Sequence, residues 1–243
     1  LKREFLLKFD KDKMRWLKWL FEAKKRFGLC IFNYCVTSNH IHLLVYNPKA
    51  DIVPNSIQLI AGRVGREYNL RKKRKGAFWE DRYHATAVES GEHLIQCFVY
   101  IDLNMVRAGV VDHPSQWKFG GYHEIQSRKQ RYSLVNQEMT TDFLGIKSRN
   151  KLPEYQRLWV DEILKSGGHK KRDKKWTESI AVGDMDFVLK TKSKLGAKGI
   201  GRKIIENNNG FELREPQAPY NPVFDPENIS LTSENTYIWD ALC

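Results

Sequence analysis

Two histidines, His40 and His42, lie two residues apart in a segment rich in apolar and aromatic side chains. Side chains at positions i and i+2 of a β-strand point to the same face and lie about 6 to 7 Å apart, so both imidazoles can reach one divalent cation. Such pairs also occur on ordinary polar strand faces, where the histidines are hydrogen-bonded or exposed. The pair is therefore compatible with a metal site but does not identify one.

Tyr100 and Asn104 are four residues apart in a segment with helical periodicity. Residues at i and i+4 are neighbours on a helix surface, so Asn104 can offer an oxygen to a metal while Tyr100 presents its phenol beside it. In the alternative interpretation, Tyr100 is an edge residue of an amphipathic helix and Asn104 only lies near its end. Tyr83 is a competing nucleophile, but it has no Asn or Gln one helical turn further on.

The elements that must position these side chains indicate an α+β fold. Apolar periodicity predicts helices over 10–27, 54–69 and 90–108, with a β-hairpin between the first two whose strands are 29–36 and 40–46. Segment 77–89 is expected to be extended. This order suits one antiparallel sheet with packed helices, and a further N-terminal strand would complete a ferredoxin-like unit.

The pattern weakens after residue 122 into polar, lysine-rich segments. Helices are expected near 153–165 and 184–195, a linker at 166–173, and extended chain with several prolines from 212 onward. We therefore expect a catalytic domain at 1–126, in which an N-terminal strand is missing, and a C-terminal extension at 127–243 with helical and extended segments.

The chain is strongly basic, with 41 Lys and Arg against 29 Asp and Glu in 243 residues and a net charge of +12. Nucleic acid is the expected partner. The candidate contacts with phosphates and bases are Arg71, Lys72, Lys73, Arg74, Lys75, Trp79, Arg82, Tyr83 and Arg107. In the alternative interpretation, the basic run is a solvated loop and the aromatic side chains belong to the core.

Several classes of protein do not fit the sequence. The four cysteines form no CxxC pair, so neither a disulfide framework nor a zinc site is expected, and a reducing cytoplasm is the simplest location. No apolar stretch reaches the roughly 18 residues of a membrane span. The chain also has no G-x-x-x-x-G-K-[ST] loop for a nucleotide triphosphate.

Three sequence blocks occur in the order 34–45 (YCVTSNHIHLLV), 78–83 (FWEDRY) and 100–109 (YIDLNMVRAG). Together they resemble the signature blocks of the REP-associated tyrosine transposases and their IS200-like relatives, which are HUH single-tyrosine transposases. The resemblance covers residues 1–126. The chain departs from the family at Thr37-Ser38, where Met-Pro is usual, and at Met105, where Pro is usual.

The resemblance implies a ferredoxin-like HUH fold and a specific reaction. His40, His42 and Asn104 would hold Mg²⁺ or Mn²⁺, and Tyr100 would attack a phosphate of single-stranded DNA to give a 5′-phosphotyrosine and a free 3′-OH. Hairpin or palindromic DNA ends and a homodimer are the implied partners. The rival interpretations are a non-catalytic hairpin DNA- or RNA-binding module of the same fold and a replication or conjugation relaxase.

Overall fold

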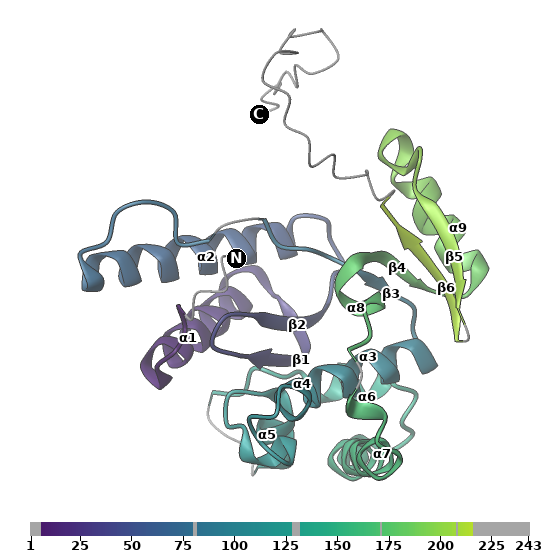
Figure 1. The fold of residues 1–243 in the computed structure, drawn as a ribbon, viewed down its shortest axis with the longest axis horizontal. Helices are drawn as coiled ribbons and strands as arrows, with labels where there is room; N and C mark the ends of the chain where they lie inside the picture. Colours follow the sequence, from purple (N-terminus) through teal and green to yellow (C-terminus); the bar gives the residue numbers. More distant parts are fainter. Residues whose placement is uncertain (1–5, 80–81, 128–131, 171, 208, 216–243) are drawn as a thin grey trace, which may run out of the picture.

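The computed structural model describes residues 6–79, 82–127, 132–170, 172–207 and 209–215. The helices are α1 (Asp10–Phe27), α2 (Ile52–Lys72), α3 (Glu92–Asp102), α4 (Asn104–Arg107), α5 (Gly121–Gln126), α6 (Gln137–Phe143), α7 (Leu152–Ser166), α8 (Lys175–Glu178) and α9 (Met185–Lys194). The strands are β1 (Cys30–Val36), β2 (Ile41–Tyr46), β3 (Ala87–Val88), β4 (Ser179–Gly183), β5 (Lys203–Asn207) and β6 (Gly210–Arg214). The predicted α+β class is confirmed (Figure 1).

The predicted hairpin forms from β1 and β2, which pair antiparallel with Cys35 opposite His42. Thr37 closes the turn between the strands. Its hydroxyl accepts a hydrogen bond from the backbone N–H of His40 and donates one to the His40 carbonyl, both at 2.8 Å. A Ser or Thr hydroxyl that bonds the backbone within three residues stabilises a turn, so the backbone at His40 is fixed locally.

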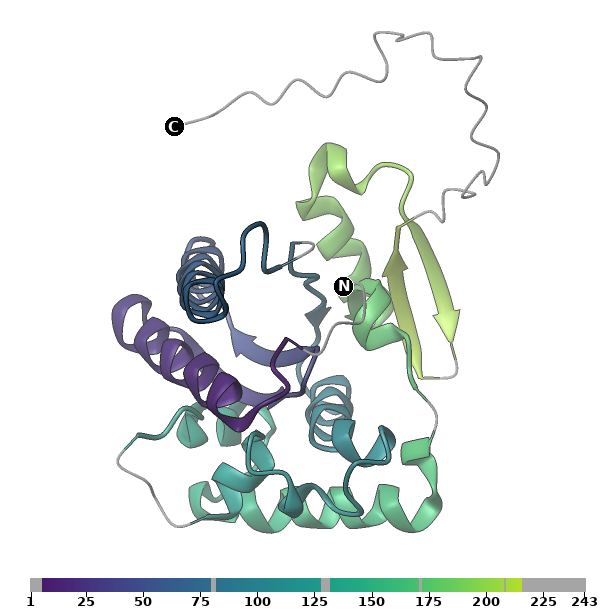
Figure 2. The same cartoon turned by 60° about the vertical axis from the view of Figure 1, so that its left-hand side comes forward.

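All seven residues of β1 are buried, which requires cover on both faces of the hairpin. Figures 1 and 2 show α1 and α2 on one side of the hairpin and α3 on the other. The single amide in this apolar strand is Asn33, whose Nδ2 donates to the Phe98 carbonyl at 3.0 Å and to Asp102 Oδ1 at 2.9 Å. These bonds fix α3 against the strand.

The sheet that contains the hairpin has two paired strands in the described residues. Isolated bridges add Val135 beside Ile31 and Gly120 beside Cys35. The four-stranded ferredoxin-like arrangement therefore stays a prediction. The prediction of one continuous helix over 90–108 was wrong. Leu103, with φ −81° and ψ 5°, separates α3 from α4.

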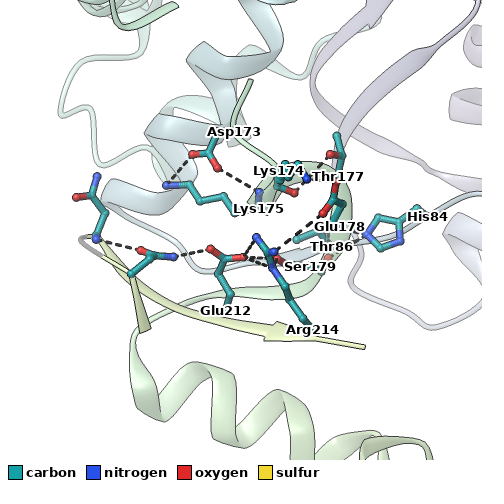
Figure 3. A network of polar contacts seen from close by, with 12 residues as sticks. His84, Thr86, Asp173, Lys174, Lys175, Thr177, Glu178, Ser179, Glu212 and Arg214 are labelled. Carbon is teal, nitrogen blue, oxygen red and sulfur yellow. Dashed lines mark hydrogen bonds and ion pairs between the residues drawn. The ribbon is translucent and has the colours of Figure 1, made fainter. Parts of the chain in front are cut away.

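A second sheet, which the sequence did not predict, has the strand order β3-β4-β6-β5. β3 lies within residues 1–126 and pairs parallel with β4, which lies in the C-terminal extension. Figure 3 shows the polar contacts around this junction, where His84 Nε2 and Thr86 Oγ1 lie 3.0 and 2.5 Å from the Ser179 carbonyl oxygen. Buried Glu212 accepts from Ser179 Oγ at 2.5 Å and pairs with Arg214 at 2.7 Å.

The helices α1, α7 and α9 confirm the predicted segments 10–27, 153–165 and 184–195 to within a residue. α1 ends at Gly28, whose φ of 71° is a left-handed conformation that glycine adopts without strain. Of the chain expected to be extended from 212 onward, residues 212–214 belong to β6, and residues 216–243 lie outside the described part.

Candidate active site

Three of the four predicted catalytic side chains meet where the start of α4 and the end of α3 face β2. The Asn104 side-chain nitrogen lies 2.9 Å from His42 Nε2. The His42 and Tyr100 rings meet edge to face, with centroids 6.2 Å apart. His40, the fourth residue, is exposed and directly precedes β2. The sequence-predicted juxtaposition of His42, Tyr100 and Asn104 is therefore present in the structure.

Burial, together with the nearby charges of His40, Arg107 and Arg172, lowers the pKa of His42 to about 4. Burial and Arg172 also lower the pKa of His40. Both imidazoles are consequently neutral near pH 7, and each keeps a nitrogen lone pair. Neutral imidazole is the form that ligates metals.

The donor types of His40, His42 and Asn104 are ones that divalent cations accept. The set consists of two neutral imidazoles and the Asn104 amide, whose oxygen and nitrogen can exchange places by rotation of the amide. In the described part of the chain, no three His, Cys, Asp or Glu side chains form a group that could hold a metal. Because the His40, His42 and Asn104 set carries no negative charge, the anionic oxygens of a phosphate would complete it.

The Tyr100 side chain is nearly enclosed, with 9% of the residue exposed. The Arg107 guanidinium lies over its ring, 3.9 Å from the centroid, and Arg107 Nη2 donates to the Tyr100 carbonyl at 3.2 Å. Arg107 thus holds the ring by a cation–π contact and the backbone by a hydrogen bond. Arg107 is thus a predicted nucleic-acid contact that touches the candidate nucleophile.

The C-terminal extension supplies neighbours of the site that sequence analysis missed. The Trp176 ring, from α8, lies 6.2 Å from the Tyr100 ring. Lys175 Nζ donates to Gln96 Oε1 at 3.2 Å and lies over the Trp176 ring. No periodicity or motif connects residues 172–176 with Tyr100, so only the fold could bring them together.

The basic run 71–75 divides between structural and exposed residues. Arg71 forms an ion pair with the buried carboxylate of Asp12 and stacks over Tyr68. Arg74 donates to the Ala77 carbonyl at 3.1 Å. Lys72, Lys73 and Lys75 are exposed.

The aromatic block after this run also divides. The Trp79 indole donates to the Ala61 carbonyl at 3.0 Å and packs edge to face on Phe78. Arg82 and Tyr83 are exposed, and Tyr83 lies outside any helix. Glu80 and Asp81 lie outside the described residues. The contacts of Trp79 with α2 indicate a bracing role, whereas Arg82 and Tyr83 remain accessible to a ligand.

Residues 2–104 match the model of a protein family described as "Transposase IS200 like". The match ends at Asn104 and so includes His40, His42 and Tyr100. No curated protein and no solved structure matches the chain. None of the described helices has the length and apolar composition of a membrane-spanning segment.

Proposed function

We propose, from the premise that residues 2–104 belong to the IS200-like transposase family, that this protein cuts and rejoins single-stranded DNA with Tyr100 as nucleophile. A transposase acts on DNA, and the net charge of +12 suits that substrate. The observation that supports the proposal is the cluster of Tyr100, His42 and Asn104, because in it a phenol ring lies beside an imidazole that contacts an amide.

In the proposed reaction, the Tyr100 phenol oxygen attacks a phosphorus atom of the DNA backbone. The new bond joins this oxygen to phosphorus, and the bond from phosphorus to the 3′-oxygen breaks. The phenol gives its proton to solvent, and the departing 3′-oxygen takes up a proton from solvent. The products are a 5′-phosphotyrosine and a free 3′-OH. The phosphotyrosine linkage is itself a phosphodiester and conserves the energy of the broken bond. A 3′-OH can therefore attack it and join strands without a nucleotide triphosphate.

The surrounding side chains bind and orient the reacting groups. His40, His42 and the Asn104 oxygen would hold Mg²⁺ or Mn²⁺, which supplies Lewis-acid stabilisation of the phosphate charge. Arg107 fixes the Tyr100 ring and adds a positive charge next to the phosphate. The lowered pKa of His42 keeps its imidazole available as a ligand near pH 7.

The proposal extends to the substrate and the assembly. We propose DNA hairpins or palindromic ends as substrates, a homodimer as the working form, and a cytoplasmic location. The hairpin of β1 and β2 would then be part of a ferredoxin-like sheet of the HUH type. Light scattering of the protein with and without hairpin DNA tests the homodimer.

The experiment that tests the function incubates the protein with labelled single-stranded DNA hairpins from its own flanking genomic sequence, with Mg²⁺, Mn²⁺ or EDTA, and resolves the products on a denaturing gel. We expect a covalent protein–DNA adduct that requires metal and is absent in Tyr100→Phe and His42→Ala. Tyr83→Phe is the matched control, because it removes the hydroxyl of the competing tyrosine and should leave the adduct unchanged. Hairpin binding without an adduct would instead support the non-catalytic binding module.

A further inference from the structure

An aromatic side chain surrounded by three ammonium groups lies on the surface at the start of α1. Phe9 is 50% exposed. The Nζ atoms of Lys8, Lys11 and Lys72 lie 5.9, 5.7 and 5.6 Å from the centroid of its ring. Lys72 comes from the last turn of α2, so two segments far apart in sequence converge on this ring. We call Phe9 with these three lysines the Phe9 platform.

Packing and helix capping do not explain a phenylalanine at this position. Half of the residue is exposed to solvent, so its ring contributes little to the core. Phe9 occupies the N-cap position of α1 and makes no side-chain capping hydrogen bond, whereas Ser, Thr, Asp and Asn are the residues that cap helices. The exposed ring is therefore free to contact a ligand.

The positive charge of the platform is not neutralised within the described residues. There, none of its three lysines forms an ion pair with a carboxylate. The two acidic residues in the first turn of α1 already have other partners, since Asp10 binds Lys118 at 2.7 Å and Asp12 binds Arg71. Three like charges around one ring repel each other, and an anion placed among them would relieve that repulsion.

The platform lies next to the turn that carries His40. The backbone N–H of Leu7 donates to the Ser38 carbonyl at 2.9 Å, and Ser38 belongs to the hairpin turn two residues before His40. Phe9 follows Leu7 by two residues, so its Cα atom lies at most about 7 Å from the Leu7 Cα atom. A polymer bound at His40 and His42 can therefore continue onto Phe9.

We propose that the Phe9 platform binds the single-stranded DNA that flanks the cleaved phosphate, with one base stacked on Phe9 and phosphates on Lys8, Lys11 and Lys72. An exposed aromatic ring within a positively charged surface is the combination that binds single strands. An acidic peptide could pair with the lysines but offers no base to cover the ring. This inference rests on the proposed function, because it assigns part of the same substrate.

The test measures binding of the full chain to a fluorescent DNA hairpin with a single-stranded flank, in EDTA, by anisotropy. Loss of one stacked base weakens binding by about 5- to 150-fold, which we expect for Phe9→Ala, whereas Phe9→Trp restores it. Met14→Ala is the matched control, because Met14 is a 56% exposed apolar residue of the same helix and should bind like wild type. Thermal unfolding of each variant confirms that it is folded.

Two further measurements separate stacking from charge. With abasic residues in the flank, wild type and Phe9→Ala should bind equally, because no base remains to stack. Lys72→Gln should reduce the slope of log K against log salt by about 0.7, whereas Phe9→Ala should leave it unchanged. Equal affinities of Phe9→Ala and Met14→Ala for the hairpin with a base-containing flank would overturn the proposal that the Phe9 platform binds single-stranded DNA.

The outcome is independent of cleavage, since binding is measured without metal. If Phe9 governs binding but no Tyr100 adduct forms, the proposed function fails and the platform stands. If the adduct forms and Phe9→Ala binds normally, the platform fails and the proposed function stands.

Discussion

Replacing Asp102 by asparagine should destabilise the fold in a way that depends on pH. Asp102 is 6% exposed, and its two oxygens accept hydrogen bonds from Asn33 Nδ2 and Gln156 Nε2, both at 2.9 Å. Both amides are held in this orientation, because Asn33 Oδ1 accepts from the Tyr34 N–H at 2.8 Å and Gln156 Oε1 accepts from Gln126 Nε2 at 3.0 Å. An asparagine at 102 would point its own NH₂ group at one of these donors. One lost hydrogen bond with a buried unsatisfied donor costs about 1 to 3 kcal/mol, which we expect at pH 5.

The pH dependence follows from the carboxyl group that the substitution removes. Burial raises the pKa of Asp102 from 3.8 to about 7 in the folded protein, although the hydrogen bonds from Asn33 and Gln156 oppose the shift. A raised folded-state pKa gives stability that is fully present below pH 3.8 and is lost as the pH rises to 7. Wild type therefore loses about 1.4 kcal/mol per pH unit from this group, or about 3 kcal/mol between pH 5 and pH 8. Because asparagine does not titrate, the variant lacks this loss.

The assay is urea unfolding of wild type and Asp102→Asn at pH 5 and pH 8, followed by circular dichroism. The variant should be less stable than wild type at pH 5, and the difference should shrink or reverse at pH 8. Asp112→Asn is the control, because Asp112 is exposed and its removal should have the same small effect at both pH values. The same destabilisation by Asp102→Asn at both values, or a larger one at pH 8, would refute the reasoning.

Three further outcomes follow from the contacts described above. Arg71→Ala should lower the free energy of unfolding in urea by about 3 kcal/mol, because it leaves the buried carboxylate of Asp12 unpaired. The control Lys73→Ala should change it by less than about 0.5 kcal/mol. Equal effects of the two substitutions would contradict the structural role of Arg71. Gly121→Ala should lower stability by about 1 to 3 kcal/mol, since a Cβ atom would lie 2.2 Å from Asn33 Oδ1, and a normal unfolding midpoint would contradict this close contact. Burial raises the pKa of Cys35 and of Cys97 to about 12, so iodoacetamide at pH 8 should modify both only after unfolding, as mass spectrometry of their peptides would show.

The sequence predicts best where one local rule determines the structure. The amphipathic pattern and Gly28 define α1, and the Thr37-Ser38-Asn39 turn defines the hairpin. The spacing of Tyr100 and Asn104 survives the break at Leu103 and still brings both residues to His42. Short-range periodicity therefore predicted the adjacency of Tyr100 and Asn104, whereas their meeting with His42 was implied by the family resemblance alone.

Contacts between distant segments could not be predicted in the same way. Trp176 reaches Tyr100 because α8 precedes a strand that pairs with β3, and neither β3 nor β4 has a strong pattern of its own. Arg71 belongs to a run that suggests phosphate binding, but the buried carboxylate of Asp12 determines its partner. Such pairings depend on which surfaces meet after folding, and the periodicity of one segment contains no information about them.

The parallel pairing of β3 with β4 also sets the order in which the protein can be completed during synthesis. Thr86 and the Ser179 carbonyl that it contacts are 93 residues apart, so the ribosome finishes the Tyr100 helix long before the partner strand exists. Domains fold from the N-terminus as they emerge, and contacts between distant residues form last. A nascent chain would carry Tyr100 without its Trp176 neighbour, and a chain interrupted before β4 would present the unpaired edge of β3. The enclosure of the tyrosine is thus a late event in the life of each molecule.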